Sequence, residues 1–175
     1  MKSRFEQLAA YNKWANARLY EAALALPDAA YRRDVGAFFK SMHGTLNHVL
    51  VGDRIWMKRL TGEGTSPNRL DAILYDDRPA LACARADEDD RIIRYIASLD
   101  DAALASVLKY ATTAGIALEQ PRADVLSHFF NHQTHHRGQA HTILSIVTGA
   151  EPPSLDLLQM QRGIVAPDLR VLASR

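Results

Sequence analysis

The sequence predicts an all-α fold, and specifically a four-helix bundle. Apolar residues recur every three or four positions in four long segments, which is the period of an amphipathic helix. Pro27, Gly62 and Gly149 follow three of these segments, and both residue types favour helix termination. With 175 residues, of which 47% are hydrophobic, the chain is long enough to bury one core. We therefore expect a single domain over residues 1–175.

Apolar stripes mark the first two helices. In the first, the buried positions recur from Phe5 to Leu26, and Pro27 stops the helix. The second helix is expected at about 38–60. Its inward line is Phe38, Met42, Thr45, Val49, Gly52, Trp56 and Leu60. A polar wedge on the same helix faces away from this line, and we expect it to point toward water: His43, Asn47, Arg54 and Lys58.

The third helix is predicted from about Pro79 to Leu99. Proline suits the first helical position because its missing N–H is not needed there. Asp76 or Asp77 can cap the free N–H groups of the first turn. The core candidates on this helix are Ile92, Ile93, Ile96 and Leu99.

A short β-hairpin is predicted just before the fourth long helix. Segments 105–110 and 115–118 alternate as strands do, with small and polar residues between them. Pro121 suits the first turn of the fourth helix, and Gly149 ends it. A short helix near 154–161 and an irregular tail complete the chain.

The composition excludes several classes of function. The formal net charge is +1, so no strong positive field attracts nucleic acid. The single cysteine, Cys83, cannot form an intrachain disulfide, which fits a reducing compartment. The sequence contains neither a signal-like apolar run at its start nor a segment that could span a bilayer. We expect a cytoplasmic protein that binds neither nucleic acid nor membrane.

The fourth helix carries five of the seven histidines. His132 and His136 are four residues apart, so they project from one face, and two such imidazoles can hold one metal ion. They fall on the apolar stripe Val125, Phe129, His132, His136, Ala140, Ile143 and Val147. The alternative is a pair of core histidines satisfied by ordinary hydrogen bonds. A shared metal ion is the better explanation for two adjacent imidazoles on a buried face, because each needs a partner.

A third ligand is expected from another helix. His48 lies at the flank of the second helix's core line, where it can point inward. His43 lies on the polar wedge and is expected to be a solvated surface histidine. Asp53 and Glu21 are weaker carboxylate candidates. No H-E-x-x-H or E-x-x-H pattern occurs, which excludes the zincin protease and bundle-type di-iron arrangements.

Other residues near the histidines have simpler interpretations. His141 projects from nearly the opposite face and is expected to be exposed. Arg137 can bind an anion or form a structural salt bridge, and Gly138 can permit close helix packing. Cys83 is expected to be a small apolar packing residue. No general base is identifiable, so the catalytic residues are unknown.

Three motifs resemble those of the DinB family. They are YNKWANARL at 11–19, GTLNHVLVGDRIW at 44–56 and NHQTHHRGQ at 131–139, and they occur in the family's order. The segment PSLDLL at 153–158 also resembles the family's C-terminal part, so the resemblance covers the whole chain.

The resemblance implies a bundle with the DinB/YfiT-like topology, a homodimer and a divalent metal ion held by three histidines. Carried over by motif, these ligands are His48, His132 and His136. The H-x-x-x-H-R-G-Q pattern selects His136 over His135 as the last of them. The metal is expected to be Zn, Ni or Fe, because imidazole ligands suit each of them.

Relatives in the wider superfamily are thiol-dependent, as in mycothiol-dependent isomerases and bacillithiol S-transferases. A metal ion with three imidazole ligands keeps an open position, where it can lower the pKa of a bound thiol. The expected function is a metal-dependent thiol S-transferase that acts on small electrophiles with a low-molecular-weight thiol as cosubstrate. The alternatives are a metal-dependent hydrolase and a non-catalytic metal-binding dimer of the stress response.

Overall fold

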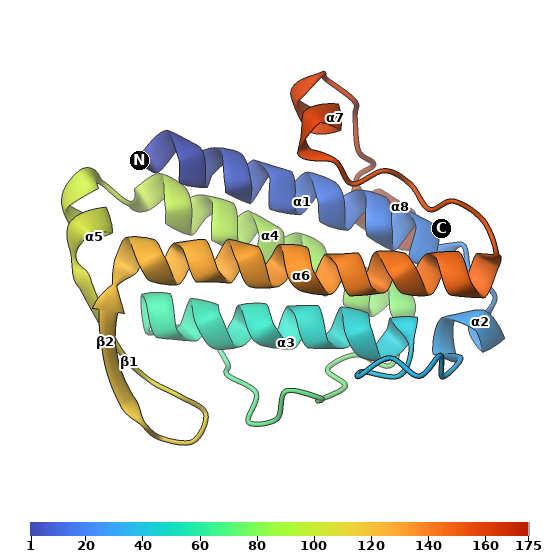
Figure 1. Ribbon diagram of the computed structural model, residues 1–175, viewed down its shortest axis with the longest axis horizontal. Helices are drawn as coiled ribbons and strands as arrows, with labels where there is room; N and C mark the ends of the chain where they lie inside the picture. Colours follow the sequence, from blue (N-terminus) through green and yellow to red (C-terminus); the bar gives the residue numbers. More distant parts are fainter. Residues whose placement is uncertain (175) are drawn as a thin grey trace.

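Four long helices pack side by side in a ring, as the sequence predicts (Figure 1). They are α1 (Lys2–Leu24), α3 (Met42–Thr61), α4 (Arg78–Ser98) and α6 (Arg122–Thr148). In this computed structural model, which describes residues 1–174, each long helix contacts two of the others, in the cyclic order α1, α4, α3 and α6. Their apolar stripes meet inside the ring, where most of the core residues are buried.

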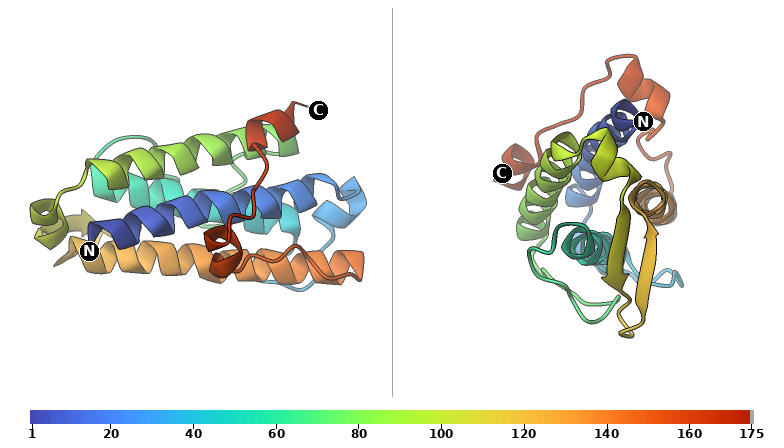
Figure 2. Two further views of the ribbon diagram at one scale, coloured as in Figure 1. Left: turned by 90° about the horizontal axis from the view of Figure 1, so that it is seen from above. Right: turned by 90° about the vertical axis from the view of Figure 1, so that its left-hand side faces the viewer.

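The chain direction divides the long helices into two pairs. α1 and α6 run one way, and α3 and α4 run the other way (Figure 1). Because α3 and α4 are parallel, the connection at 62–77 must return along the length of α3. Figure 2 shows the C-terminal segment crossing α1. The same figure shows the 62–77 loop on the outer side of α3. The loop passes His48, in the first half of α3, where the Leu70 carbonyl oxygen lies 2.7 Å from Nδ1 of this histidine.

Four short helices join or follow the long ones: α2 (Asp28–Arg32), α5 (Asp101–Ala105), α7 (Leu157–Gln161) and α8 (Leu169–Ala173). The short helix expected at 154–161 corresponds to α7. The sequence predicted none of the other three, because a five-residue helix is too short to show a period. Across residues 1–174, no helix combines the length and the apolar character that crossing a membrane requires.

The predicted hairpin is confirmed just ahead of α6. β1 (Val107–Ala111) pairs antiparallel with β2 (Ala117–Pro121), in a register that places Tyr110 opposite Leu118. Pro121 ends β2 and precedes α6 instead of lying in its first turn, which corrects the expected boundary by one position. The hairpin contacts both α3 and α6. It therefore closes one end of the space between these two helices.

The predicted start of the second long helix at 38 is wrong. The helix begins at Met42, and the side chain of Ser41 caps it by accepting a hydrogen bond from Gly44 N at 3.2 Å. Residues 37–40 form a tight turn with a bridge between Ala37 and Lys40, whose φ is 67°. Phe38 belongs to this turn and is 86% exposed, so it is no part of the core.

The polar wedge on α3 does not face water as a whole. Asn47 is completely buried and His43 is 8% exposed. The Asn47 side-chain oxygen accepts hydrogen bonds from the backbone N–H groups of Leu74 and Tyr75, at 2.8 and 3.0 Å. Its amide nitrogen donates to the Tyr75 carbonyl at 3.1 Å. Asn47 therefore fastens the 62–77 loop to α3 and satisfies polar backbone groups that the loop would otherwise leave unpaired.

The remaining helix ends and stripes follow the sequence closely. Asp77 caps α4 by accepting from Ala80 N at 2.9 Å, and Gly149 ends α6 in the left-handed conformation. α1 ends at Leu24, shortly before Pro27. The residues expected in the core but only half-buried are Leu8, Ala22, Trp56, Ile93 and Val147.

Candidate metal centre

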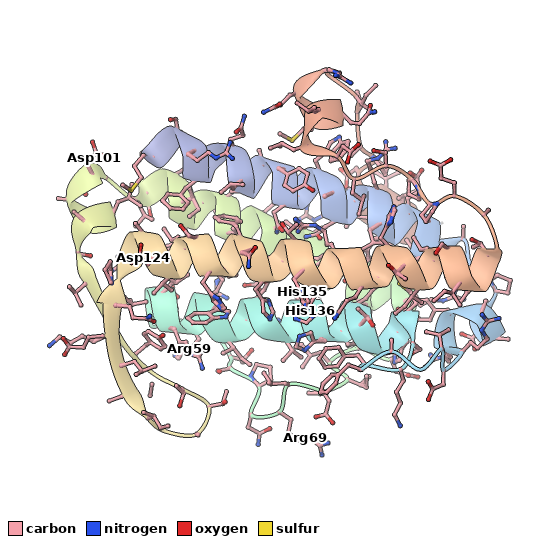
Figure 3. All side chains as sticks on the ribbon, in the orientation of Figure 1. Arg59, Arg69, Asp101, Asp124, His135 and His136 are labelled. Carbon is pink, nitrogen blue, oxygen red and sulfur yellow. The ribbon has the colours of Figure 1, made fainter. Side chains whose placement is uncertain are left out.

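Three histidines converge between α3 and α6. His48 comes from α3, and His132 and His136 come from successive turns of α6. One ring nitrogen from each lies within 4.8 Å of the other two, a spacing at which all three could hold one metal ion. Figure 3 labels His136 near the middle of the bundle, between the two helices. The residues that the sequence and the resemblance predicted as ligands are thus brought together in space.

A glycine makes room for one of these rings. A Cβ atom at Gly52 would lie 2.8 Å from Cε1 of His132, closer than real Cβ atoms approach a neighbour. Gly52 stands one helical turn after His48, so it occupies the stretch of α3 that faces the cluster. Gly138, expected to permit close packing, has no atom within 4 Å of its Cβ position, so that expectation is wrong. The crowded glycine is on α3 and not on α6.

Hydrogen bonds orient two of the rings. Nδ1 of His48 lies 2.7 Å from the Leu70 carbonyl oxygen, which can only accept, so this nitrogen carries the proton. Nδ1 of His136 lies 2.8 Å from Oε1 of Gln139 and donates to it. With both Nδ1 atoms donating, each Nε2 atom presents a lone pair. Holding the distal nitrogen of an imidazole in this way is the usual support for a metal-binding histidine.

The two Nε2 atoms face each other. His48 Nε2 and His136 Nε2 are 3.1 Å apart. Two lone pairs at this distance repel each other, and a cation that accepts both removes the repulsion. His132 adds a further sign of a missing partner, because its Nδ1 is buried without a hydrogen bond within residues 1–174. The donor set and its unsatisfied atom therefore fit a divalent metal ion.

Burial keeps these imidazoles neutral. The pKa of His48 is lowered to about 4 and that of His132 to about 3, mainly by burial, and the neighbouring histidines contribute to both shifts. Burial also lowers the pKa of His136. The neutral ring is the form that binds a metal, so all three are ready to bind at neutral pH.

An aromatic ring from the turn before α3 covers part of the cluster. Phe39 stacks on His48 with 3.7 Å between ring centroids and 16° between planes. Its centroid is 5.8 Å from that of His136, in an edge-to-face arrangement. Phe39 therefore shields the rings from solvent on one side. Leu46, one turn into α3, is 1% exposed and belongs to the core.

The stripe on α6 is rotated relative to the prediction. His132 and His136 are half-buried, whereas Gln133 and Arg137 are 0 and 2% exposed and point into the bundle. His135 is exposed, as the choice of His136 requires. The histidine pair thus lies at the edge of the buried face, where a ligand can reach it. In each of the pairs His132–Gln133 and His136–Arg137, the histidine faces the edge of the bundle and the next residue faces its polar interior.

The other predicted ligand candidates lie outside the cluster. Asp53 is fully buried and pairs with Arg85, and Glu21 is exposed. His43 is not a surface histidine: its ring contacts Tyr31 edge-to-face at 5.5 Å, and burial lowers its pKa. His141 is half-buried, with Nε2 3.0 Å from the Pro153 carbonyl oxygen, and not exposed as expected.

A buried polar network lies in the bundle interior. Arg85 pairs with both Asp53 and Asp89, and the amide nitrogens of Asn12 and Asn16 donate to Asp89 at 3.0 and 2.9 Å. Arg137 joins this network by donating to Asn12. The structural salt bridge expected for Arg137 is not formed among residues 1–174, because the guanidinium donates to Asn12 and Thr134 and no carboxylate lies within 4.0 Å of it. This network explains the asparagines of the first motif as structural residues.

A groove opens beside the cluster at His132. Its volume is about 480 Å³. Its walls come from α3, the 62–77 loop, the hairpin and α6, and they include Gly52, Trp56, Leu70, Tyr110, His128 and His132. Both aromatic and polar side chains line it, as is usual for small-molecule sites. A ligand in this groove would reach the open side of an ion held by the three histidines.

The fold and the site define a class of protein: a helical bundle with three converging histidines that could hold a metal ion. The family model described as "DinB family" matches residues 1–167. The chain belongs to the DinB family. It is also similar to Protein DinB of Bacillus subtilis (strain 168), with 23% identity over 150 residues, which cover 82% of this chain and 86% of that protein.

Proposed function

We propose that His48, His132 and His136 bind one divalent metal ion, Zn, Ni or Fe, and that the protein is a metal-dependent thiol S-transferase acting on small electrophiles. The facing Nε2 atoms of His48 and His136, 3.1 Å apart, carry the metal assignment. The groove that opens at His132 favours a reactive metal site over a structural one. A structural metal ion usually has a fourth protein ligand, which leaves no open position for a substrate.

When bound, the ion supplies one kind of chemistry: it lowers the pKa of a coordinated thiol, so that the thiolate is present at neutral pH. The chain's own residues prepare the site for this. The Leu70 carbonyl and Gln139 keep the Nε2 lone pairs of His48 and His136 directed at the ion. Phe39 excludes water on the side of His48, which strengthens electrostatic interactions within the site.

The proposed reaction is a simple substitution. The sulfur of the cosubstrate attacks the electrophilic carbon, an S–C bond forms, and the leaving group departs with its electron pair. The thiol proton is released to solvent, because the sequence and the groove offer no established general base. The reacting sulfur comes from the cosubstrate, so Cys83, a half-buried cysteine on α4, takes no part.

The experiment is a panel of electrophiles assayed with several cellular thiols, with and without a chelator. We expect turnover only when both thiol and metal are present. His48→Ala should abolish it, whereas Cys83→Ala should leave it unchanged. Turnover without a thiol would favour the hydrolase, and metal binding with no turnover would favour a non-catalytic role. Conjugation that survives His48→Ala but is lost in Cys83→Ala would disprove the proposed mechanism.

A further inference from the structure

One arginine of the groove has no acidic partner. Arg59, on the last turn of α3, lines the groove together with Trp56 and Tyr110. Within residues 1–174, the only hydrogen bond of its side chain runs from Nε to the Ala111 carbonyl at 3.1 Å, and the side chain forms no salt bridge. Figure 3 labels Arg59 where α3 approaches the hairpin. Both terminal nitrogens of the guanidinium are therefore available to a ligand.

Aromatic rings hold this guanidinium in place. Its carbon lies 4.5 Å from the Trp56 ring centroid and 5.4 Å from that of Tyr110. Trp56 also packs edge-to-face against Tyr110 and His128 at 5.5 and 5.0 Å. An arginine stacked on aromatic faces presents its planar fork with little freedom left to lose on binding. The position is thus fixed by α3 and the hairpin together before any ligand arrives.

The partial burial of the Arg59 guanidinium also favours binding of an anion beside it. The partly buried surroundings lower the pKa of Arg59 from its ordinary value, which marks a charge that is poorly solvated. The groove holds one other formal charge, the exposed carboxylate of Asp124 at the start of α6, and it does not pair with Arg59. A planar anion with two oxygens would match the free fork of the guanidinium.

The distance from the histidine cluster sets the size of the ligand. Gly52 contacts His132, and Arg59 follows seven residues later on α3, which corresponds to about 10 Å along a helix. A molecule bound at the metal and at Arg59 must therefore carry its anionic group several bonds away from its metal-binding atom. A single cysteine is too short, whereas a peptide-like thiol has the required reach.

We propose that this groove binds a carboxylate-bearing, peptide-sized thiol, with the carboxylate paired to Arg59 and the sulfur toward His132. The inference rests on the proposed function for the role of the sulfur. The carboxylate site at Arg59 stands on its own geometry. Arg59 would orient the cosubstrate and so act as a positioning residue, which takes no part in the bond changes.

The test measures binding by calorimetry, with S-methylglutathione as the probe. Its blocked thiol cannot become a thiolate, so the carboxylate contact is measured without the metal chemistry. We expect the free acid to bind wild-type protein more tightly than its diethyl ester, and Arg59→Gln to weaken binding of the acid about tenfold or more. Arg59→Lys, which keeps the charge but loses the fork, should fall between the two. Binding of the ester should not change in either variant.

Arg69→Gln is the matched control, because Arg69 is an exposed arginine already paired with Asp71 at 2.8 Å and lies outside the groove. Equal affinity of wild-type protein for acid and ester would overturn the inference without relying on any variant. An unchanged affinity for the acid in Arg59→Gln would also overturn it. If acid binding depends on Arg59 but thiol-dependent turnover is absent, the carboxylate site holds and the proposed function fails.

Discussion

Gly52 and His132 face each other across the contact of α3 with α6, at a separation that leaves no space for a Cβ atom. The imidazole occupies the volume that a side chain on α3 would fill. His48 lies one helical turn before Gly52 on α3. The contact of Gly52 with His132 therefore fixes where the His132 ring can lie relative to His48. The geometry of the cluster therefore depends on a residue that offers no ligand atom.

Gly52→Ala should displace the His132 ring and weaken metal binding by about tenfold or more, a loss typical of changes to the residues that support metal ligands. The fold should persist, because the atom that must move is part of a side chain and alanine favours helix over glycine. Gly138→Ala is the control, since its Cβ position is open. Competition with a chelating dye measures both affinities. Equal affinities in the two variants would contradict this account.

The second prediction concerns metal content. One divalent ion should bind per chain, and His48→Ala, His132→Ala or His136→Ala should each abolish it. His135→Ala should retain the ion, because His135 is exposed and its ring packs edge-to-face against His136, with no nitrogen among the three that converge. Elemental analysis of the purified variants provides the measurement. Loss of metal from His135→Ala combined with retention in His136→Ala would refute the assignment.

The third prediction concerns pH and the metal-free protein. The pKa of His48 is about 4 and that of His132 about 3 in the folded state, against about 6.5 in the unfolded chain. The unfolded state therefore binds protons first as the pH falls. The stability that neutral rings provide is present above about pH 6.5 and is lost as the pH falls toward 4. Each histidine can contribute a slope of up to about 1.4 kcal/mol per pH unit.

Urea unfolding of the chelator-treated protein at a series of pH values measures this slope. The matched control is the double variant His48→Gln, His132→Gln, in which the free energy of unfolding should depend less steeply on pH over the same range. Acidic residues titrate in both proteins, so the difference between the two slopes isolates the histidines. Identical slopes would show that these rings are not held neutral by folding.

The fourth prediction is the homodimer that the family resemblance implies. Light scattering at micromolar concentration should give twice the chain mass. Leu46 cannot belong to the contact, because it is 1% exposed, and Phe39 already stacks on His48. A monomer mass would refute the prediction.

The sequence was sufficient for the features that depend on local spacing. His132 and His136 are one helical turn apart, so a single helix fixes their proximity whatever the rest of the fold does. The four long helices likewise follow from their apolar period. His48 required more, because its inward direction was only permitted by the helical wheel. Its assignment came from the resemblance.

What the sequence missed depends on contacts between distant segments. The Leu70 carbonyl that orients His48 is a backbone atom in a loop, and no residue type signals it. Buried polar residues are a second feature that a helical period does not predict. Asn47 appeared solvent-facing because a period cannot distinguish water from a polar partner, and its partners lie 27 and 28 residues away in the chain.

The ligands of the cluster come from two different helices, and even the two nearest in sequence across them, His48 and His132, are 84 positions apart. Neither helix alone can gather all three nitrogens, so the unfolded chain should bind an ion far more weakly than the native one. Binding would then add to the free energy of folding, by about 4 kcal/mol when the free ion is a thousandfold above its dissociation constant. The ion would act as a crosslink between the two halves of the chain. When the supply of metal in the cell falls, the protein would therefore unfold at a lower temperature.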